Sequence, residues 1–155
     1  PRTGAQWSAP QKYEITADTL SAFGHPAVSP DGEFLYFVSD MPGGYGGKDI
    51  WRISLTEKEG TLENLGVQIN TPGDEMFPYI QSNGDLYFSS DGHPGMGGLD
   101  IFKARMNDSG FWQIENMKAP INSALPSGKK KADFFHRTAE TDADMTTYTV
   151  SSFRR

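Results

Sequence analysis

Residues 25–53 read HPAVSPDGEFLYFVSDMPGGYGGKDIWRI, and residues 77–104 repeat the pattern as FPYIQSNGDLYFSSDGHPGMGGLDIFKA. Pro26 corresponds to Pro78, 52 residues later, and Tyr36 corresponds to Tyr87, 51 residues later, so one residue is dropped in the turn between them. Self-similarity at a fixed period of this size is typical of repeat architectures. This doubled stretch therefore decides the fold that we expect for the chain.

Each copy contains four segments that we expect to be β-strands. The second segment of each copy is a short apolar run bounded by turn signals, which is typical of a strand buried on both faces. The preceding SPDG and QSNG place Pro, Asp or Asn, and Gly where tight turns prefer them, so a hairpin is expected there. The expected strands are residues 25–29, 33–39, 49–54 and 61–65 in the first copy, and 77–81, 85–90, 100–105 and 111–116 in the second.

Four antiparallel strands in a unit of about fifty residues are typical of a β-propeller blade. We therefore predict an all-β fold, a partial β-propeller of about two and a half four-stranded blades that repeat every 51–52 residues. Because closed propellers usually have about 4–8 blades, the remaining blades should come from the same or another chain. The predicted organisation is an outer strand around Trp7 and a linker (1–24), a blade (25–65), a connection (66–76), a second blade (77–116) and a divergent partial blade with strands at 132–137 and 146–152 (117–155).

Composition narrows the function classes. The net charge of -6 gives no reason to expect binding to nucleic acid or to an anionic membrane surface. The absence of cysteine excludes disulfides and thiolate metal sites, and no apolar run approaches the length of a membrane span, so direct membrane insertion is not expected. The first residues, PRTGAQW, contain neither an initiator Met nor a signal-peptide core, so we expect a mature or excised piece.

Glycines and aspartates recur at equivalent positions, and we interpret them as structural. A carboxylate repeated once per blade more often caps backbone N–H groups than performs chemistry. The Gly-rich loops at residues 40–48 and 91–99 should need positive φ at several positions. They resemble a calcium-binding nonapeptide only loosely, because the aspartate comes one residue late. The residues assigned to these turns are Asp31, Gly32, Asp40, Gly46, Asp49, Gly84, Asp91, Gly97 and Asp100.

No catalytic residue, cofactor or metal site is predicted, and we do not expect an enzyme. His25, His93 and His136 lack metal-ligand spacing, and His25 stands in the place of Phe77, so it should be a partly buried substitute. No G-x-S-x-G nucleophile elbow is present. The pair of carboxylates at residues 74–75 is expected to lie solvated in a loop.

The alternation of strand direction places the long loops on one rim and the short turns on the other. The long-loop rim comprises residues 40–48, 66–76, 91–99 and 118–131. Binding residues concentrate on longer loops that a rigid scaffold holds, so we expect this rim to be the contact surface. The candidate binding residues are Tyr45, Lys48, His93, Met96, Lys129, Lys130 and Lys131.

Several motifs carry a family resemblance. SPDG at 29–32, LYF at 35–37, SD at 39–40 and GGYGGKDIW at 43–51 resemble the Pro-Asp variant of the WD-type (WD40-like) repeat of TolB-like periplasmic propellers. The GGxGGxDI form, followed by LGxxINTP at 65–72, is similar to repeats in bacterial envelope proteins, including OmpA-type and type IX secretion-associated proteins.

This resemblance implies a non-catalytic protein-binding or scaffolding propeller segment. It also implies a periplasmic or outer-membrane-associated location and protein partners in the cell envelope. Because propellers host many activities, two alternatives remain open at this point. One is a propeller domain accessory to a prolyl-oligopeptidase-like hydrolase, and the other is a propeller that binds a small ligand or metal in its central channel.

Overall fold

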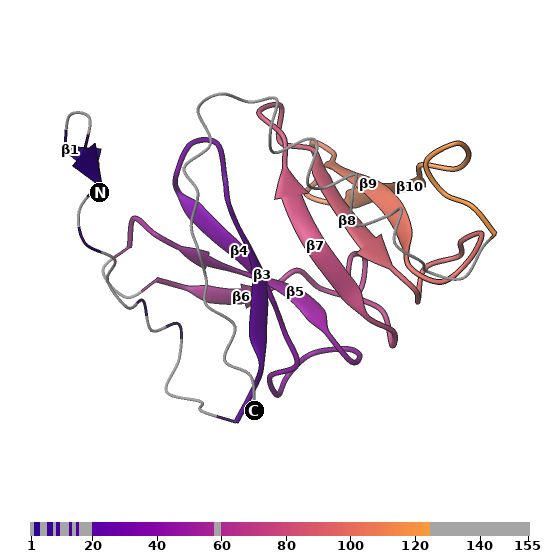
Figure 1. The fold of residues 1–155 in the computed structure, drawn as a ribbon, viewed down its shortest axis with the longest axis horizontal. Coiled ribbons are helices and arrows are strands. Elements are labelled where there is room, and N and C mark those ends of the chain that lie inside the picture. Colours follow the sequence, from indigo (N-terminus) through magenta and orange to yellow (C-terminus); the bar gives the residue numbers. More distant parts are fainter. Residues whose placement is uncertain are drawn as a thin grey trace.

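The computed structural model describes residues 2–3, 6–7, 9, 13, 15, 20–57 and 60–124 of the 155-residue chain (Figure 1). Within these residues the fold is all-β without helices, and it contains two four-stranded antiparallel sheets. The predicted all-β class and the four antiparallel strands in each copy are thereby confirmed. The strands expected at 132–137 and 146–152, His136, and Lys129, Lys130 and Lys131 lie outside the described residues.

Both sheets are simple meanders, in which each strand pairs with the next one along the chain. The first sheet consists of β3 (Phe23–Val28), β4 (Phe34–Ser39), β5 (Asp49–Ser54) and β6 (Leu62–Asn64). The second consists of β7 (Glu75–Ile80), β8 (Leu86–Ser90), β9 (Asp100–Met106) and β10 (Trp112–Asn116). The first strand of each sheet begins two residues earlier than predicted, and this shift matters for Glu75 below.

The short hairpin turns follow from their residues. Gly32 has φ +75° and Gly84 has φ +85°, a left-handed conformation that glycine adopts without the strain of a Cβ. The N–H of Gly32 donates to the carbonyl of Ser29 at 2.8 Å, and the N–H of Gly84 donates to that of Gln81 at 2.8 Å. Asp31 accepts the hydroxyl of Ser29 at 2.5 Å, and this hydrogen bond lowers the pKa of the carboxyl group.

The main hydrophobic core lies between the two sheets. The first sheet contributes Tyr36, Val38 and Ile50 from one face, and β7 packs against β3, β4 and β5, as Figure 1 shows. A separate cluster covers the opposite face of the first sheet, so β4 is buried on both faces as its apolar run predicts. That cluster consists of Phe37, Met41, Trp51 and Ile53, with Ile15, Phe23 and Leu35 packed against it.

The beginning of the chain differs from the prediction. The short strand β2 (Gln6–Trp7) pairs with β1 (Arg2–Thr3), with Trp7 opposite Arg2. In the described part of the chain β2 joins neither four-stranded sheet, so Trp7 does not occupy the outer-strand position expected for it. β2 pairs with β1 because the two strands are close in sequence, so closing the loop between them costs little conformational entropy.

Candidate functional site on the long-loop rim

Three long loops meet where the two sheets join, and they bond to one another through their backbones. The N–H of Gly47 donates to the carbonyl of Gly73 at 2.9 Å, and the N–H of Glu75 donates to that of Lys48 at 2.7 Å. On the other side, the N–H of Asp91 donates to the carbonyl of Asp74 at 3.3 Å. We name this structure the rim seam; it comprises residues 46–48, 71–75 and 90–93. The rim seam holds the connection between the two Gly-rich loops.

Close packing of backbones in the rim seam explains its glycines. A Cβ on Gly46 would overlap the carbonyl oxygen of Thr71 and lie 2.5 Å from that of Gly73. A Cβ on Gly92 would overlap the Thr71 hydroxyl from the opposite side. The prediction of positive φ at several positions of these loops is therefore wrong, because Gly43 alone adopts it among the described residues of both loops. Gly46 and Gly97 are not among the positive-φ residues, and for Gly46 the close approach of another backbone requires glycine.

Asp40 and Asp91 have equivalent long-range roles. Asp40 accepts the N–H of Ala22 at 2.7 Å, and Asp91 accepts the N–H of Asp74 at 2.8 Å. In each sheet the acceptor follows the second strand and the donor directly precedes the first strand. These carboxylates therefore join two strand ends of one sheet, whereas the sequence suggested capping within a local turn.

Asp49 and Asp100 hold the tips of the Gly-rich loops. Asp49 accepts the N–H groups of Tyr45 at 2.6 Å and Gly46 at 3.1 Å. Asp100 in the same way accepts the N–H groups of Met96 and Gly97. Both carboxylates are buried, so their oxygens are committed to loop structure and are not displayed to solvent.

The two loop tips themselves remain exposed. Tyr45 is 50% exposed and Met96 is 43% exposed, at equivalent positions on loops whose backbones are held by buried aspartates. Val67, on the connection between the sheets, is 65% exposed on the same rim. A large apolar side chain on a rigid support is a suitable contact anchor, because little conformational entropy remains to be lost on binding.

Lys48 and His93, two further candidate binding residues, are engaged within the protein. The backbone N–H of Lys48 donates to Asp74 at 3.0 Å, and its ammonium group lies 3.3 Å from the same carboxylate. The ring of His93 is bonded to the carbonyl of Ile69 at 2.9 Å and lies against Phe102, with 5.1 Å between ring centroids. Both side chains therefore have partners within the protein, although the Lys48 side chain is 45% exposed.

His25 and Phe77 occupy equivalent β-bulges on β3 and β7, and their rings stack with 4.0 Å between centroids. Both residues have positive φ, 49° and 56°, which is uncommon for residues other than glycine. The N–H of Phe77 donates to Nδ1 of His25 at 3.4 Å, while burial and the charge of Lys48 lower the pKa of His25. The partly buried setting predicted for His25 is thus observed.

Two buried asparagines, for which the sequence suggested no role, attach each connection to its sheet. The amide of Asn70 bonds both the N–H of Ile50 at 2.8 Å and its carbonyl at 2.9 Å. Asn122 makes the same pair of bonds to Ile101, at 2.8 and 2.9 Å. The sequence signal for this role was the recurrence of Ile-Asn after the fourth strand of each copy. An amide that is buried in both copies is expected to have hydrogen-bond partners in both.

Glu75 is the largest departure from the sequence-based expectation. The carboxylate pair at 74–75 was expected in solvent, yet Glu75 begins β7 and is fully buried. It accepts the N–H of Thr71 at 2.8 Å, the Thr71 hydroxyl at 2.6 Å and the Ser90 hydroxyl at 2.6 Å. Burial raises the pKa of Glu75, although these hydrogen bonds oppose the shift. The sequence did contain a signal that position 75 is buried, because the equivalent residue 52 positions earlier is the apolar Phe23.

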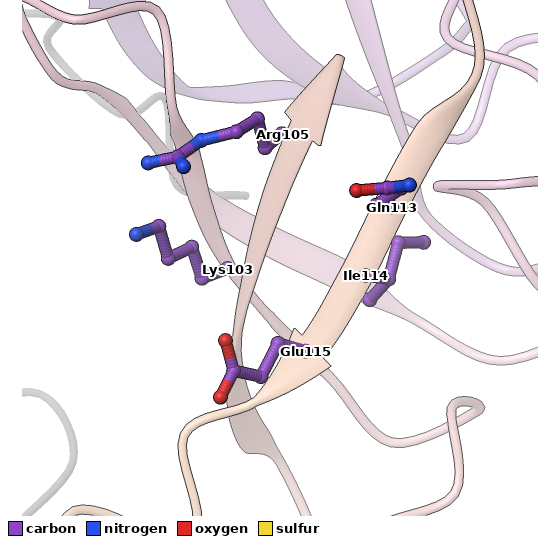
Figure 2. A pocket seen from close by; sticks show the side chains of 5 residues that line it. All are labelled: Lys103, Arg105, Gln113, Ile114 and Glu115. Carbon is purple, nitrogen blue, oxygen red and sulfur yellow. The ribbon is translucent and has the colours of Figure 1, made fainter. Parts of the chain in front are cut away.

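A shallow depression of 280 Å³ lies away from the rim seam, on β9 and β10 (Figure 2). Lys103 and Arg105 extend from β9 to the same side, and both bond Asp85, with shortest distances of 2.9 and 2.7 Å. The hydrogen bond from Arg105 is the largest cause of a strongly lowered Asp85 pKa. The cations of this depression are therefore already paired with a buried carboxylate.

Comparison with protein-family models and with curated proteins identifies no relative. No protein-family model matches the sequence, and no curated protein matches it. Among the described residues no helix is long and apolar enough to span a membrane. The same residues contain no group of three or more His, Cys, Asp or Glu side chains arranged to hold a metal ion.

Proposed function

We propose that the chain is a segment of a TolB-like β-propeller, and that it acts as a non-catalytic protein-binding or scaffolding module. The proposal takes the two sheets as neighbouring blades, because a single connection leads from the last strand of one meander to the first strand of the next. The remaining blades would come from the same or another chain. The resemblance to OmpA-type and type IX secretion-associated repeats supports a location in the bacterial cell envelope, in the periplasm or at the outer membrane, as part of this proposal.

The observation that carries the binding role is the pair of exposed apolar tips on the long-loop rim. Tyr45 and Met96 lie at equivalent positions of the repeat, and each tip is held by the carboxylate of a buried aspartate. Aromatic and methionine side chains are frequent anchors of protein interfaces. A partner protein of the cell envelope would thus contact two anchors at a spacing that the scaffold sets.

Selective removal of the two anchors tests this function. The immobilised chain would be used to capture partners from a bacterial envelope extract, beside a double variant with Tyr45→Ser and Met96→Ser. We expect the double variant to lose a partner that the unmodified chain retains, since each anchor of an interface contributes about 1 kcal/mol or more.

A matched control uses exposed apolar residues on the opposite rim. Leu55 directly follows β5 and Met106 is the last residue of β9, and the two are also equivalent in the repeat. The variant with Leu55→Ser and Met106→Ser should capture the same partners as the unmodified chain. Equal losses in both variants, or full retention by the rim variant, would contradict the assignment of the long-loop rim.

A further inference from the structure

The hairpin between β7 and β8 places an asparagine before a glycine in an exposed turn. Residues 81–84 are all exposed, whereas Asp85, which directly follows them, is buried. The chain has six asparagines, at positions 64, 70, 83, 107, 116 and 122, and only Asn83 is followed by glycine. The backbone nitrogen that follows an asparagine can attack the side-chain amide, and a side chain on the following residue hinders that attack. Asn83 therefore has the least hindered neighbouring nitrogen.

The surroundings of Gly84 leave this nitrogen accessible. Gly84 has φ +85°, and a Cβ added to it would have no atom within 4 Å. The N–H of Gly84 donates to the carbonyl of Gln81 at 2.8 Å, so the turn must open briefly before the nitrogen can react. Exposed turns with few buried contacts open locally at a small cost in free energy. This hydrogen bond therefore slows the attack but does not prevent it.

The side-chain amide of Asn83 is held by Asp85. Its Oδ1 accepts the backbone N–H of Asp85 at 3.1 Å, and its Nδ2 donates to the Asp85 carboxylate at 3.0 Å. When a nucleophile attacks Cγ of the amide, negative charge develops on Oδ1. A backbone N–H that already points at this oxygen stabilises the charge, as the donors of an oxyanion hole do. The fold thus provides both an accessible nucleophile and a donor for the developing charge.

We propose that Asn83 is a site of spontaneous deamidation, at which the amide is converted into a carboxylate beside Asp85. The nitrogen of Gly84 gives its proton to water or hydroxide and bonds to Cγ of Asn83, which closes a succinimide ring. The bond between Cγ and Nδ2 breaks, and ammonia leaves after taking up a proton. Water then opens the ring at Cγ to give aspartate, or at the backbone carbonyl to give isoaspartate. No group is oxidised or reduced.

The first copy of the repeat shows that this turn accommodates an aspartate. Asp31 stands at the position of Asn83, and Gly32 stands at the position of Gly84. Asp31 accepts the N–H of Glu33 at 2.9 Å, just as Asn83 accepts the N–H of Asp85 at 3.1 Å. An aspartate produced at position 83 can therefore keep the backbone hydrogen bond of the turn.

Deamidation changes the charge around Asp85. Lys103 and Arg105 bond the buried carboxylate of Asp85, with shortest distances of 2.9 and 2.7 Å. Asn83 contributes a neutral donor to the same carboxylate. The reaction replaces this donor with a second anion, which competes with Asp85 for the two cations. The modification thus adds a negative charge to this end of the second sheet.

Peptide mapping by mass spectrometry tests the site on the full chain. After incubation at mildly alkaline pH, we expect the mass shift of amide-to-acid conversion at Asn83, together with isoaspartate detected by an isoaspartyl methyltransferase. Asn107 is the internal control: its Oδ1 also accepts the N–H of the residue two positions later, Ser109, at 3.0 Å, but Asp108 follows it in the chain. An unmodified Asn83, or equal conversion of Asn83 and Asn107, would overturn the proposal.

Two variants test the contribution of the turn. Asn83→Gln lengthens the side chain, so ring closure is slower and position 83 should stay unmodified over the same period. Asp31→Asn places an asparagine before Gly32 in the equivalent turn of the first sheet, and this residue should revert in part to aspartate. Conversion of the glutamine variant as fast as Asn83, or an Asp31→Asn chain that stays unmodified, would contradict the assignment.

The deamidation site does not depend on the proposed binding function, since every readout is made on the chain alone. If Asn83 is converted and the anchor variants still capture every partner, the binding role fails while the modification site stands.

Discussion

Replacing Asn70 with alanine should destabilise the protein far more than the loss of one polar side chain from a connection would suggest. Asn70 bonds the N–H and the carbonyl of Ile50, and its amide also donates to Asn64 at 2.8 Å. Ile50 is fully buried in the core between the sheets. Asn70→Ala therefore leaves the backbone N–H of Ile50 without its partner, whereas the Ile50 carbonyl still accepts the N–H of Leu65 at 3.1 Å.

The magnitude follows from the one unsatisfied N–H group. A buried polar group that loses its partner costs about 1–3 kcal/mol, so the free energy of unfolding should fall by about 1–3 kcal/mol. With a urea m-value of about 1–3 kcal/mol/M, the denaturation midpoint should fall by an amount on the order of 1 M, at an unchanged m-value. Urea titration followed by circular dichroism measures both quantities.

Two further variants give this prediction its controls. Asn122→Ala removes the equivalent pair of bonds to Ile101 and should cause a loss of similar size. Asn83→Ala removes an amide from an exposed turn and should cost less than about 1 kcal/mol. A loss below about 1 kcal/mol for Asn70→Ala would refute the view that the asparagine completes the backbone bonding of β5.

Two more predictions concern close packing and acid stability. Gly46→Ala should lower the free energy of unfolding by about 1–3 kcal/mol in urea titrations, because the added Cβ overlaps the Thr71 carbonyl. Gly24→Ala is the control: no atom lies within 4 Å of its added Cβ, so stability should change by less than about 0.5 kcal/mol. Similar values for both variants would contradict the packing argument. The lowered pKa of Asp85 means that its ion pairs stabilise the fold above the ordinary aspartate pKa and lose that effect as the pH falls toward the folded pKa. Thermal melts should therefore show a smaller loss of stability on acidification for Asp85→Asn than for the unmodified chain, and parallel curves would count against it.

Local chemistry was sufficient to predict the strands and short turns. SPDG and QSNG each place a glycine where the chain requires positive φ, and Gly32 and Gly84 adopt it. The β-forming run from Phe34 to Ser39 pairs with both of its neighbours, as its double-sided burial implies. These features depend on residues close together in sequence, and their repetition in the second copy strengthens each inference.

The candidate site was predictable only in part. The exposed tips Tyr45 and Met96 follow from their place in Gly-rich loops. The engagement of Lys48 with Asp74 does not, because 26 residues separate them and their meeting depends on how the sheets pack. Similarly, the reason for glycine at position 46 lies in the carbonyl of Thr71, which no local pattern reveals.

The sequence by itself determined the repeating unit, its four strands and the turns that reverse the chain, because these depend on local conformational preference and on apolar patterning. Only the tertiary structure decided which polar groups lose their water. Glu75, Asn70 and Asp49 all lie next to loop residues in the sequence, yet all three are buried where one segment crosses another. Burial of a polar side chain requires donors or acceptors from distant segments, and those partners exist only once the two sheets have packed together.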